Sequence, residues 1–414
     1  MTSNTTTNES YDVVVIGGGP AGATIATFLQ RQRHRCMILE SSTFPRYHIG
    51  ESLIPHTYGT LDRLGLLPKL RESNFPHKYS VRFVSPSGRE SDPFYFSETI
   101  DGEGAQTWQV ERSEFDEICL DHARENGVEV RMATKVEEVL FDGDWATGVR
   151  AKSRDGSPYQ VHAKVVVDAS GRRSLIGKQL GLRDSVPGLK KASLWSYYRG
   201  GKRLEGIDAG ETTIFMIPEC GWFWYIPLPK DIVSVGIVAS PEYLFLDSDD
   251  SESVFLREVD KCGPLKERLL KATRTDNVRG FSELAYRNRQ VTGNGWVMIG
   301  DAAVFLDPIY SSGLFLALGS AELAATSVHE GLTDGNLSAE KLGAFVGPLQ
   351  QGVEIIERLI FAFYDPSFSF GKFVKKYPQH RPALIDCLVG DVIDKNMDSF
   401  LMALDEMSPM TQGA

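Results

Sequence analysis

The stretch YDVVVIGGGPAG at residues 11–22 decides the fold of this chain. Its first half is apolar and β-branched, and it predicts a buried parallel strand. The glycines then have separate functions, because Gly17 allows a tight turn, Gly19 lets the backbone approach a pyrophosphate, and Gly22 lets a helix pack closely on the strand. Ala21 stands within the turn, and residues 23–32 have helical character. The segment therefore predicts a dinucleotide-binding strand, turn and helix.

An acidic residue closes this unit. A second predicted strand at residues 36–39 ends on Glu40, which stands 18 residues after Gly22. A carboxylate at that place can accept hydrogen bonds from ribose hydroxyls. An acid instead of a base also disfavours a 2′-phosphate. The order of elements predicts a dinucleotide site but does not separate NAD from FAD.

Composition argues against several functions. The formal net charge of −11 disfavours general nucleic-acid binding, which depends on phosphate neutralisation. No apolar run approaches the ~18 residues of a membrane span. Residues 1–10 are mostly Ser, Thr and Asn, so we expect a frayed tail and not a signal peptide.

The cysteines and histidines show no metal-binding pattern. The five cysteines are scattered and contain no Cys-x-x-Cys pair: Cys36, Cys119, Cys220, Cys262 and Cys387. We interpret them as reduced thiols of a cytoplasmic enzyme. The eight histidines form no cluster, so no metal site is expected.

Two later segments identify the nucleotide. Residues 165–171 (VVVDASG) and 296–303 (WVMIGDAA) each read as a strand that leads into a turn. With the first motif they resemble the glutathione-reductase-type FAD fold shared by aromatic hydroxylases, geranylgeranyl reductases and halogenases. The resemblance implies that Asp301 holds the ribityl chain. The helix that follows would point its positive end at the flavin and favour the reduced ring.

The resemblance also implies the rest of the cofactor site. Val136 falls where the family's backbone meets adenine, and Arg112 resembles an arginine near the flavin; a helix-start salt bridge is the alternative for Arg112. The full set assigned to FAD is Gly17, Gly19, Ala21, Gly22, Glu40, Arg46, Gly50, Ser52, Arg112, Val136, Gly300, Asp301 and Pro308.

A loop and a lysine narrow the class. Residues 44–53 (FPRYHIGESL) resemble the Gly-Glu-Ser-Leu loop of flavin-dependent halogenases and some related reductases. Lys78, in NFPHKY at residues 74–79, resembles the essential lysine of the halogenases. In that family reduced flavin and O2 form a C4a-hydroperoxide that oxidises chloride or bromide to hypohalous acid. Lysine suits the delivery of this species, because partial burial lowers its pKa and exposes a nucleophilic amine.

The segment FLDPIYSSGL at residues 305–314 resembles the family's halide site. There, backbone N–H groups near Ser312 and Gly313 would hold the halide beside the flavin. An N-cap serine on a structural helix is the alternative for Ser312, and both can hold. Tryptophan halogenases carry a glutamate where this chain has Tyr310, so free tryptophan is not the expected substrate.

The aromatic stretch GWFWYIP at residues 221–227 resembles the Trp-x-Trp-x-Ile-Pro signature of the halogenases. In a strand, Trp222 and Trp224 share one face, while Phe223 and Tyr225 share the other. A plain core strand is the alternative. By the resemblance, Trp222 and Trp224, with Phe223 and Pro227, wall a tunnel that separates substrate from flavin.

The chain is therefore expected to be an α/β protein with a glutathione-reductase-type FAD-binding (Rossmann-like) domain, an inserted antiparallel β-sheet substrate domain and a short helical C-terminal region. The FAD-binding domain is placed at residues 1–76, 106–180 and 276–330, the β-sheet domain at 77–105 and 181–275, and the helical region at 331–414. Within the last region, residues 353–363 and 382–402 have helical spacing.

The resemblance implies an FADH2-dependent halogenase that acts on an electron-rich pyrrole or phenol, free or tethered to an acyl or peptidyl carrier protein, in secondary metabolism. No second nucleotide motif is present, so a separate flavin reductase should supply FADH2. Basic residues at 190–191 and 372–376 could receive an acidic carrier protein or form an ordinary solvated face. Two other hypotheses remain: a monooxygenase or reductase that uses NAD(P)H without halide, and a non-catalytic flavoprotein.

Overall fold

The computed structural model describes residues 10–218, 221–247, 250–393 and 395–408. The expected tail at residues 1–10 lies outside these ranges except for Ser10, which begins a strand and is not frayed, and Cys220 also lies outside them. The other four cysteines are buried and free.

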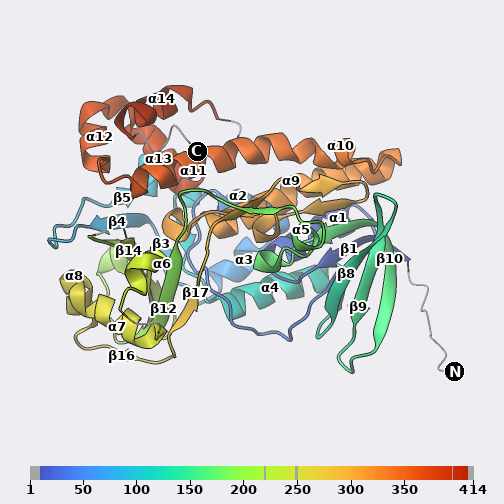
Figure 1. Ribbon diagram of the computed structural model, residues 1–414, viewed down its shortest axis with the longest axis horizontal. Coiled ribbons are helices and arrows are strands. Elements are labelled where there is room, and N and C mark those ends of the chain that lie inside the picture. Colours follow the sequence, from blue (N-terminus) through green and yellow to red (C-terminus); the bar gives the residue numbers. More distant parts are fainter. Residues whose placement is uncertain (1–9, 219–220, 248–249, 394, 409–414) are drawn as a thin grey trace.

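The first sheet carries the nucleotide motif (Figure 1). Its main path runs β19-β20-β10-β1-β2-β7, and β1 pairs in parallel with both β10 and β2. Helices α1, α4 and α9 pack together beside this sheet. The bounds are β1 Ser10–Ile16, β2 Cys36–Leu39, β7 Glu129–Arg131, β8 Lys135–Asp142, β9 Trp145–Lys152, β10 Pro158–Asp168, β19 Thr292–Gly293, β20 Trp296–Met298, α1 Pro20–Arg31, α4 Arg112–Glu125 and α9 Ser312–Asp334.

The glycine turn has the geometry that its sequence predicts. Gly17 has φ +103°, a conformation that favours glycine. A Cβ on Gly22 would lie 2.0 Å from the carbonyl oxygen of Gly17. No other residue type fits at position 22 while α1 stays this close to β1.

The second sheet follows the order β16-β12-β15-β14-β13-β4-β5, with β17 paired to β12. Its neighbouring strands are antiparallel except for β13 and β4, which are parallel. Helices α6, α7 and α8 lie beside it at the lower left of Figure 1. The bounds are β4 Ser80–Val84, β5 Phe94–Tyr95, β12 Ala192–Arg199, β13 Thr212–Ile217, β14 Gly221–Leu228, β15 Ile232–Ala239, β16 Thr273–Arg274, β17 Arg279–Phe281, α6 Pro241–Leu244, α7 Ser251–Lys261 and α8 Gly263–Leu269.

Strand β14 is buried on both faces, as its alternation predicts. Trp222 and Trp224 belong to the large core shared with the flavin-side elements. Phe223 and Tyr225 belong to a separate core beneath α7 and α8, where Phe223 packs against Phe255. Each face of the strand therefore serves a different layer.

Shorter elements connect the two sheets. They are β3 His77–Lys78, paired with β6 Thr107–Trp108; a three-stranded sheet of β11 Arg183–Ser185, β18 Tyr286–Asn288 and β21 Val304–Phe305; and helices α2 Thr57–Leu64, α3 Leu67–Arg71 and α5 Leu175–Gln179. The two sheets and the helical C-terminus confirm the predicted fold class. The residue numbers at which one domain gives way to the next remain a prediction.

The C-terminal region consists of helices: α12, α13 and α14 lie above the second sheet at the upper left of Figure 1, whereas α10 lies at the right and contacts α9 and β19 of the first sheet. Its elements are α10 Ala339–Leu342, α11 Val346–Tyr364, α12 Phe370–Lys376, α13 Arg381–Val389 and α14 Asp398–Met407. The helical spacing expected across residues 382–402 is interrupted, because Gly390 has φ +87° and ends α13.

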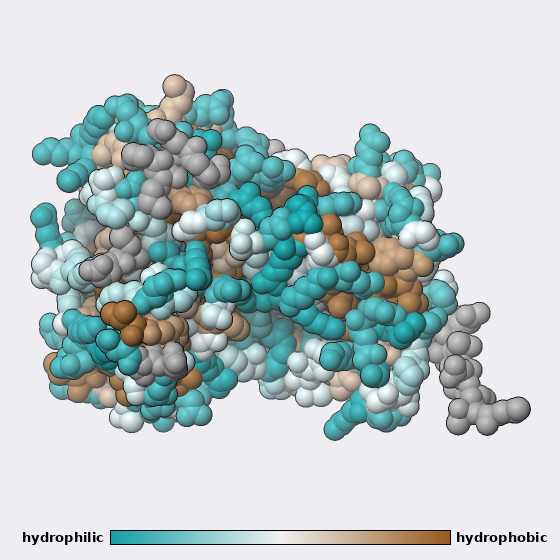
Figure 2. All heavy atoms as spheres, viewed as in Figure 1, coloured by the Kyte–Doolittle hydropathy of each residue, from teal (hydrophilic) through white to brown (hydrophobic). Residues whose placement is uncertain are grey.

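Hydrophilic residues cover much of the face in Figure 2, and hydrophobic residues form separate patches. Among the helices of the described residues, none is long and apolar enough to cross a membrane.

Candidate active site

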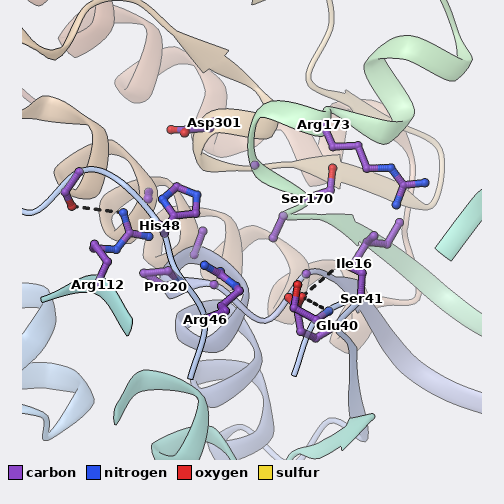
Figure 3. Close-up of a pocket in the computed structure, with 18 of the residues that line it drawn as sticks. Ile16, Pro20, Glu40, Ser41, Arg46, His48, Arg112, Ser170, Arg173 and Asp301 are labelled. Atoms are coloured by element: carbon purple, nitrogen blue, oxygen red, sulfur yellow. Dashed lines mark hydrogen bonds between the residues drawn. The ribbon is translucent and has the colours of Figure 1, made fainter. Parts of the chain in front are cut away.

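A groove of about 380 Å³ runs past the glycine turn (Figure 3). Glu40 and Ser41 lie at one end of it, and Arg112 and His48 lie at the other. The residues predicted to bind FAD that line this groove are Gly17, Gly19, Ala21, Glu40, Arg46, Gly50, Arg112, Val136 and Asp301. Gly22 and Gly300 support the groove by close packing, while Ser52 and Pro308 line a neighbouring cavity.

Glu40 is fixed by the backbone. Its carboxylate accepts the N–H of Gly18 at 2.8 Å and the N–H of Ser42 at 2.7 Å. Main-chain donors hold a carboxylate in one orientation without a mobile partner. The main chain thus fixes the orientation of Glu40 at the end of β2, and its bond to ribose hydroxyls stays a prediction.

Arg112 ties the loop at residues 44–53 to helix α4. Its guanidinium donates to the carbonyl oxygen of Ile49 at 2.6 Å and to that of Gly50 at 3.2 Å. The same group pairs with Asp116 at 2.7 Å, and Arg46 reaches Asp116 at 3.1 Å. Arg112 therefore makes the helix-start salt bridge and also lines the groove, while its contact with the flavin stays a prediction.

Asp301 lines both the groove and the neighbouring cavity and, with Glu40, is one of two acidic residues among the described residues that line the groove. Its carboxylate makes no hydrogen bond to another residue of the described chain. Burial raises the pKa of Asp301 to about 6, against the opposing effect of Arg172 and Arg112. An unpaired acid aimed into a groove with a glycine-lined turn fits a ligand rich in hydroxyls. The residues present therefore fit FAD.

An apolar cavity of about 120 Å³ adjoins the groove, and we call it the chamber. Residues 48–50, Asp301 and Gly313 line both the groove and the chamber, and residues 51–52 of the same loop line the chamber. Strand β14 supplies the opposite wall through Trp222, Trp224 and Ile226. The chamber therefore lies between the flavin groove and the aromatic strand.

Both indoles of the wall are anchored. The Nε1 of Trp222 donates to the hydroxyl of Tyr364 at 2.9 Å, and the Nε1 of Trp224 donates to Ser234 Oγ at 3.0 Å. Tyr364 in turn donates to Asp307 at 2.9 Å. Because Tyr364 belongs to α11, the C-terminal region holds this wall in place.

Two residues predicted for the wall lie elsewhere. Phe223 points to the other face of the sheet, where Phe255 covers it. Pro227 is buried and paired with Val233, outside the chamber lining. The alternation of a strand explains both results, since only every second side chain of β14 can face the chamber.

Lys78 lies directly behind the chamber wall. Its side chain is fully buried, and Nζ donates to Ser52 Oγ at 2.9 Å and to the carbonyl oxygen of Leu53 at 3.2 Å. Ser52 lines the chamber, whereas Lys78 does not. Burial lowers the pKa of Lys78 to about 7, so much of the amine is neutral near neutral pH.

Helix α9 begins at the junction of groove and chamber. Ser311 has φ +55° and lines the chamber, and Gly313 lines both spaces. Ser312 is buried and outside both linings. The first turn of this 23-residue helix thus offers backbone N–H groups, without an opposing Cβ at Gly313, to an anion.

Sequence reasoning missed several lining residues. In the groove they are Ser41, Ser42, Tyr47, His48, Thr134, Ser170 and Arg173, and in the chamber Glu51, Arg172, Trp195, Thr212 and Ser311. Most come from loops whose direction no local pattern reveals. Glu51 could have been found, because it stands between Gly50 and Ser52, which were both predicted.

Comparison with known proteins agrees with this geometry. A family model described as "FAD binding domain" matches residues 10–198. The 1H-pyrrole-2-carbonyl-peptidyl-carrier-protein chlorinase of Pseudomonas fluorescens is 32% identical, over 93% of this chain and 90% of that protein. The corresponding brominase of Pseudoalteromonas luteoviolacea is 30% identical, over 93% of each chain. The structure of the flavin-dependent brominase Bmp2 has a TM-score of 0.86 at 30% identity, over 96% of this chain and 98% of that one.

Fold and groove together define an FAD-binding oxidoreductase whose groove adjoins a small apolar chamber. The chain belongs to the flavin-dependent halogenase family and is a flavin-dependent halogenase enzyme.

Proposed function

We propose that this enzyme halogenates an electron-rich pyrrole or phenol and that Lys78 delivers the halogen. The observation that carries the proposal is the buried amine of Lys78 behind Ser52, next to a chamber walled by Trp222 and Trp224. The names of the pyrrole-modifying relatives support the substrate class. Tyr310 supports it too, because its buried hydroxyl donates to the carbonyl oxygen of Leu359 and supplies no base.

The cofactor and the halide would occupy adjoining places. Gly17, Gly19, Glu40 and Asp301 would hold FAD, which when reduced supplies, with O2, the oxidising equivalents that turn chloride or bromide into hypohalous acid. The backbone N–H groups at the start of α9 would bind the halide near Gly313, where the helix dipole favours an anion.

The chamber would exclude the aromatic substrate. Its volume of about 120 Å³ is smaller than the 300–1,000 Å³ of ordinary ligand pockets, and both indoles are hydrogen-bonded in place. Hypohalous acid is small enough to cross such a space. A substrate ring kept on the far side would be halogenated and protected from hydroxylation.

Lys78 would receive the reagent on that far side. At neutral pH, a large fraction of its amine carries a free lone pair, because burial has lowered the pKa to about 7. The amine can hydrogen-bond hypohalous acid or form a haloamine, and either form presents an electrophilic halogen. Ser52 links the amine to the chamber from which the reagent comes.

We also propose that the substrate is carried by an acidic carrier protein and that a separate reductase supplies reduced flavin. Lys372 and Lys375 are exposed on α12 and offer a basic patch. Lys190 pairs with Glu242, and Lys191 is buried with its ammonium 3.8 Å from the ring centre of Tyr364, so neither adds a free surface charge.

The test supplies FADH2, O2 and chloride or bromide with an aromatic panel in two forms, free and carrier-bound. A product with the halogen mass shift on a pyrrole or phenol is the expected result. A hydroxylated product that forms without halide would contradict the proposal. The double variant Lys372→Glu/Lys375→Glu should slow halogenation of the carrier-bound substrate and leave that of the free substrate unchanged. If the double variant changes neither rate, α12 is not the docking site.

A further inference from the structure

Glu51 occupies a boundary between two cavities. It lines the apolar chamber and also a second cavity of about 310 Å³ on the other side of its loop. Exposed charged residues, including Arg199 and Lys230, line this second cavity. The carboxyl of Glu51 is itself buried, with 3% of the residue exposed. Glu51 therefore lines both the apolar chamber and the second, more polar cavity.

A chain of hydroxyl groups connects Glu51 to solvent. The hydroxyl of Tyr197 donates to Glu51 Oε1 at 2.7 Å. The hydroxyls of Tyr197 and Tyr47 are 3.1 Å apart, and 43% of Tyr47 is exposed. Three oxygen atoms within hydrogen-bond distance therefore lead from the buried carboxyl to Tyr47, which lines the second cavity as well as the groove.

Indole groups set the direction of this chain. Trp195 Nε1 donates to the hydroxyl of Tyr47 at 2.5 Å, and an indole nitrogen can only donate. Tyr47 is thereby left with its own proton to give to Tyr197, which gives its proton to Glu51. Trp224 Nε1 donates to Ser234, whose hydroxyl opposes the rise in the pKa of Glu51. The chain through Tyr197 therefore ends with a proton directed at the carboxyl.

The halogenation proposed above creates a need for such a chain. Over a full turnover, reduced flavin, O2, halide, an aromatic C–H and one proton give oxidised flavin, the aryl halide and two waters. One proton must therefore enter from solution for each product. Other polar groups such as Asp301 and Thr212 also line the chamber, but the carboxyl of Glu51 is hydrogen-bonded to a chain of tyrosine hydroxyls that leads away from the chamber.

We propose that Glu51 is the proton-transfer residue of the chamber and that Tyr197 and Tyr47 connect it to solvent. This inference rests on the proposed function. In the transfer, water protonates Tyr47 as Tyr47 gives its proton to Tyr197 and Tyr197 gives its proton to Glu51. An O–H bond forms at each acceptor as one breaks at each donor, so the net result is a neutral Glu51 and one proton removed from water. The proton then passes from Glu51 to an oxygen atom derived from O2, which leaves as water, and Glu51 becomes a carboxylate again.

The surroundings of Glu51 allow it to change charge near neutral pH. Burial raises the pKa of Glu51 to about 7, opposed by Tyr197 of β12, Ser234 of β15 and Arg112 of α4. On its own loop the neighbouring His48 is kept neutral, because burial lowers the pKa of that imidazole to about 4. The two tyrosines keep their protons, since burial raises the pKa of each.

The first test needs no turnover. Infrared difference spectra of the FAD-loaded protein, recorded from about pH 5 to pH 9 without halide or substrate, should show a carboxyl band that Glu51→Gln abolishes. Tyr197→Phe should move the midpoint of this band upward, because it removes a hydrogen bond to the carboxylate. Tyr198→Phe is the matched control, because Tyr198 follows Tyr197 in the sequence and its own hydroxyl has no hydrogen-bond partner among the described residues. If Glu51→Gln still shows this carboxyl band, the proposal is overturned.

The second test follows product formation. Glu51→Gln and Tyr197→Phe should each lower turnover by about 10²-fold, and Glu51→Gln should also lose the fall in rate on the alkaline side. Equal rates in Tyr197→Phe and Tyr198→Phe, or an unchanged pH profile in Glu51→Gln, would contradict the proposal. If wild-type protein halogenates nothing, the proposed function fails, while the infrared titration still decides whether Tyr197 connects to Glu51.

Discussion

The flavin groove and the chamber meet at the loop of residues 48–52. Each is lined by one buried glutamate, but the two carboxyl groups have different hydrogen-bond donors. In the groove, main-chain N–H groups hold the carboxylate of Glu40. At the chamber, side-chain hydroxyls surround Glu51, and burial raises its pKa to about 7. Fixed backbone donors suit a group that must keep one orientation to bind a ligand. Hydroxyl partners suit a group that must gain and lose a proton.

The largest effect on halogenated product is expected from a substitution of Lys78, which lies behind the chamber wall. Lys78→Met should reduce halogenated product by about 10²–10⁴-fold, because no amine then receives the reagent. Reduced flavin and O2 should still be consumed, since the groove is intact. Product analysis by mass spectrometry and O2 uptake measure the two quantities. The exposed Lys152→Met is the control, and normal halogenation by Lys78→Met would contradict the role of the amine.

The fold of Lys78→Met can be checked independently. The folded-state pKa of about 7 lies below the ordinary 10.5, so folding disfavours the charged amine, and this cost is complete below about pH 7 and falls as the pH rises. The variant should therefore have a higher Tm than wild type near pH 6, by thermal unfolding, and a lower Tm would show that it has lost packing instead.

The next effect separates the two faces of β14. Trp222→Ala should cost about 3–5 kcal/mol of stability and should also open the wall, so that hydroxylated product or free hypohalous acid appears. Phe223→Ala should cost a similar amount, because its ring is fully buried against Phe255, but leave the product unchanged. Denaturant unfolding and product analysis check both variants. The same products from both would show that the wall has no special function.

A smaller effect contrasts the two glutamates. Because the pKa of Glu51 rises from 4.5 to about 7 on folding, its ionisation lowers stability as the pH increases through this window, by roughly 3 kcal/mol in all. Glu51→Gln should therefore be more stable than wild type near pH 8 and not near pH 4. Glu40→Gln should lose about 1–3 kcal/mol, because its amide N–H group faces backbone donors. If Glu51→Gln and Glu40→Gln are both more stable than wild type at pH 8, the two glutamates do not differ in the way proposed.

The smallest effect concerns cofactor binding. Asp301→Asn should weaken FAD binding by about ten- to a hundredfold, which corresponds to about 1.4–2.8 kcal/mol, if the carboxylate accepts the ribityl hydroxyls. Titration of the apoprotein with FAD, followed by flavin fluorescence, measures this change. Asp301 also lines the chamber, but asparagine keeps the size of the side chain, so product per bound flavin should stay near wild type. Unchanged affinity would show that Asp301 does not contact the cofactor.

The sequence predicted the groove better than the chamber. Gly17, Glu40 and Asp301 stand at ends of strands in one parallel sheet, where local order determines position in space. Phe223 was misplaced because a wall was assigned to consecutive residues, although alternate side chains of β14 face opposite layers.

Other features depend on contacts between distant segments. The hydrogen bond from Trp222 to Tyr364 spans 142 residues, and that from Tyr197 to Glu51 spans 146. No local pattern contains such pairs. The position of Lys78 behind Ser52 is of the same kind, since the short pairing of β3 with β6 brings the lysine to the loop.

The most direct measurement is product formation in the presence of an excess of an external thioether, which destroys hypohalous acid in solution. The account predicts that the wild-type yield is unchanged, because the reagent passes from the groove through the chamber to Lys78 without release, and that Lys78→Met yields oxidised thioether and no product. Loss of the wild-type product to the thioether would contradict the account, because the halogenating agent would then act from bulk solution.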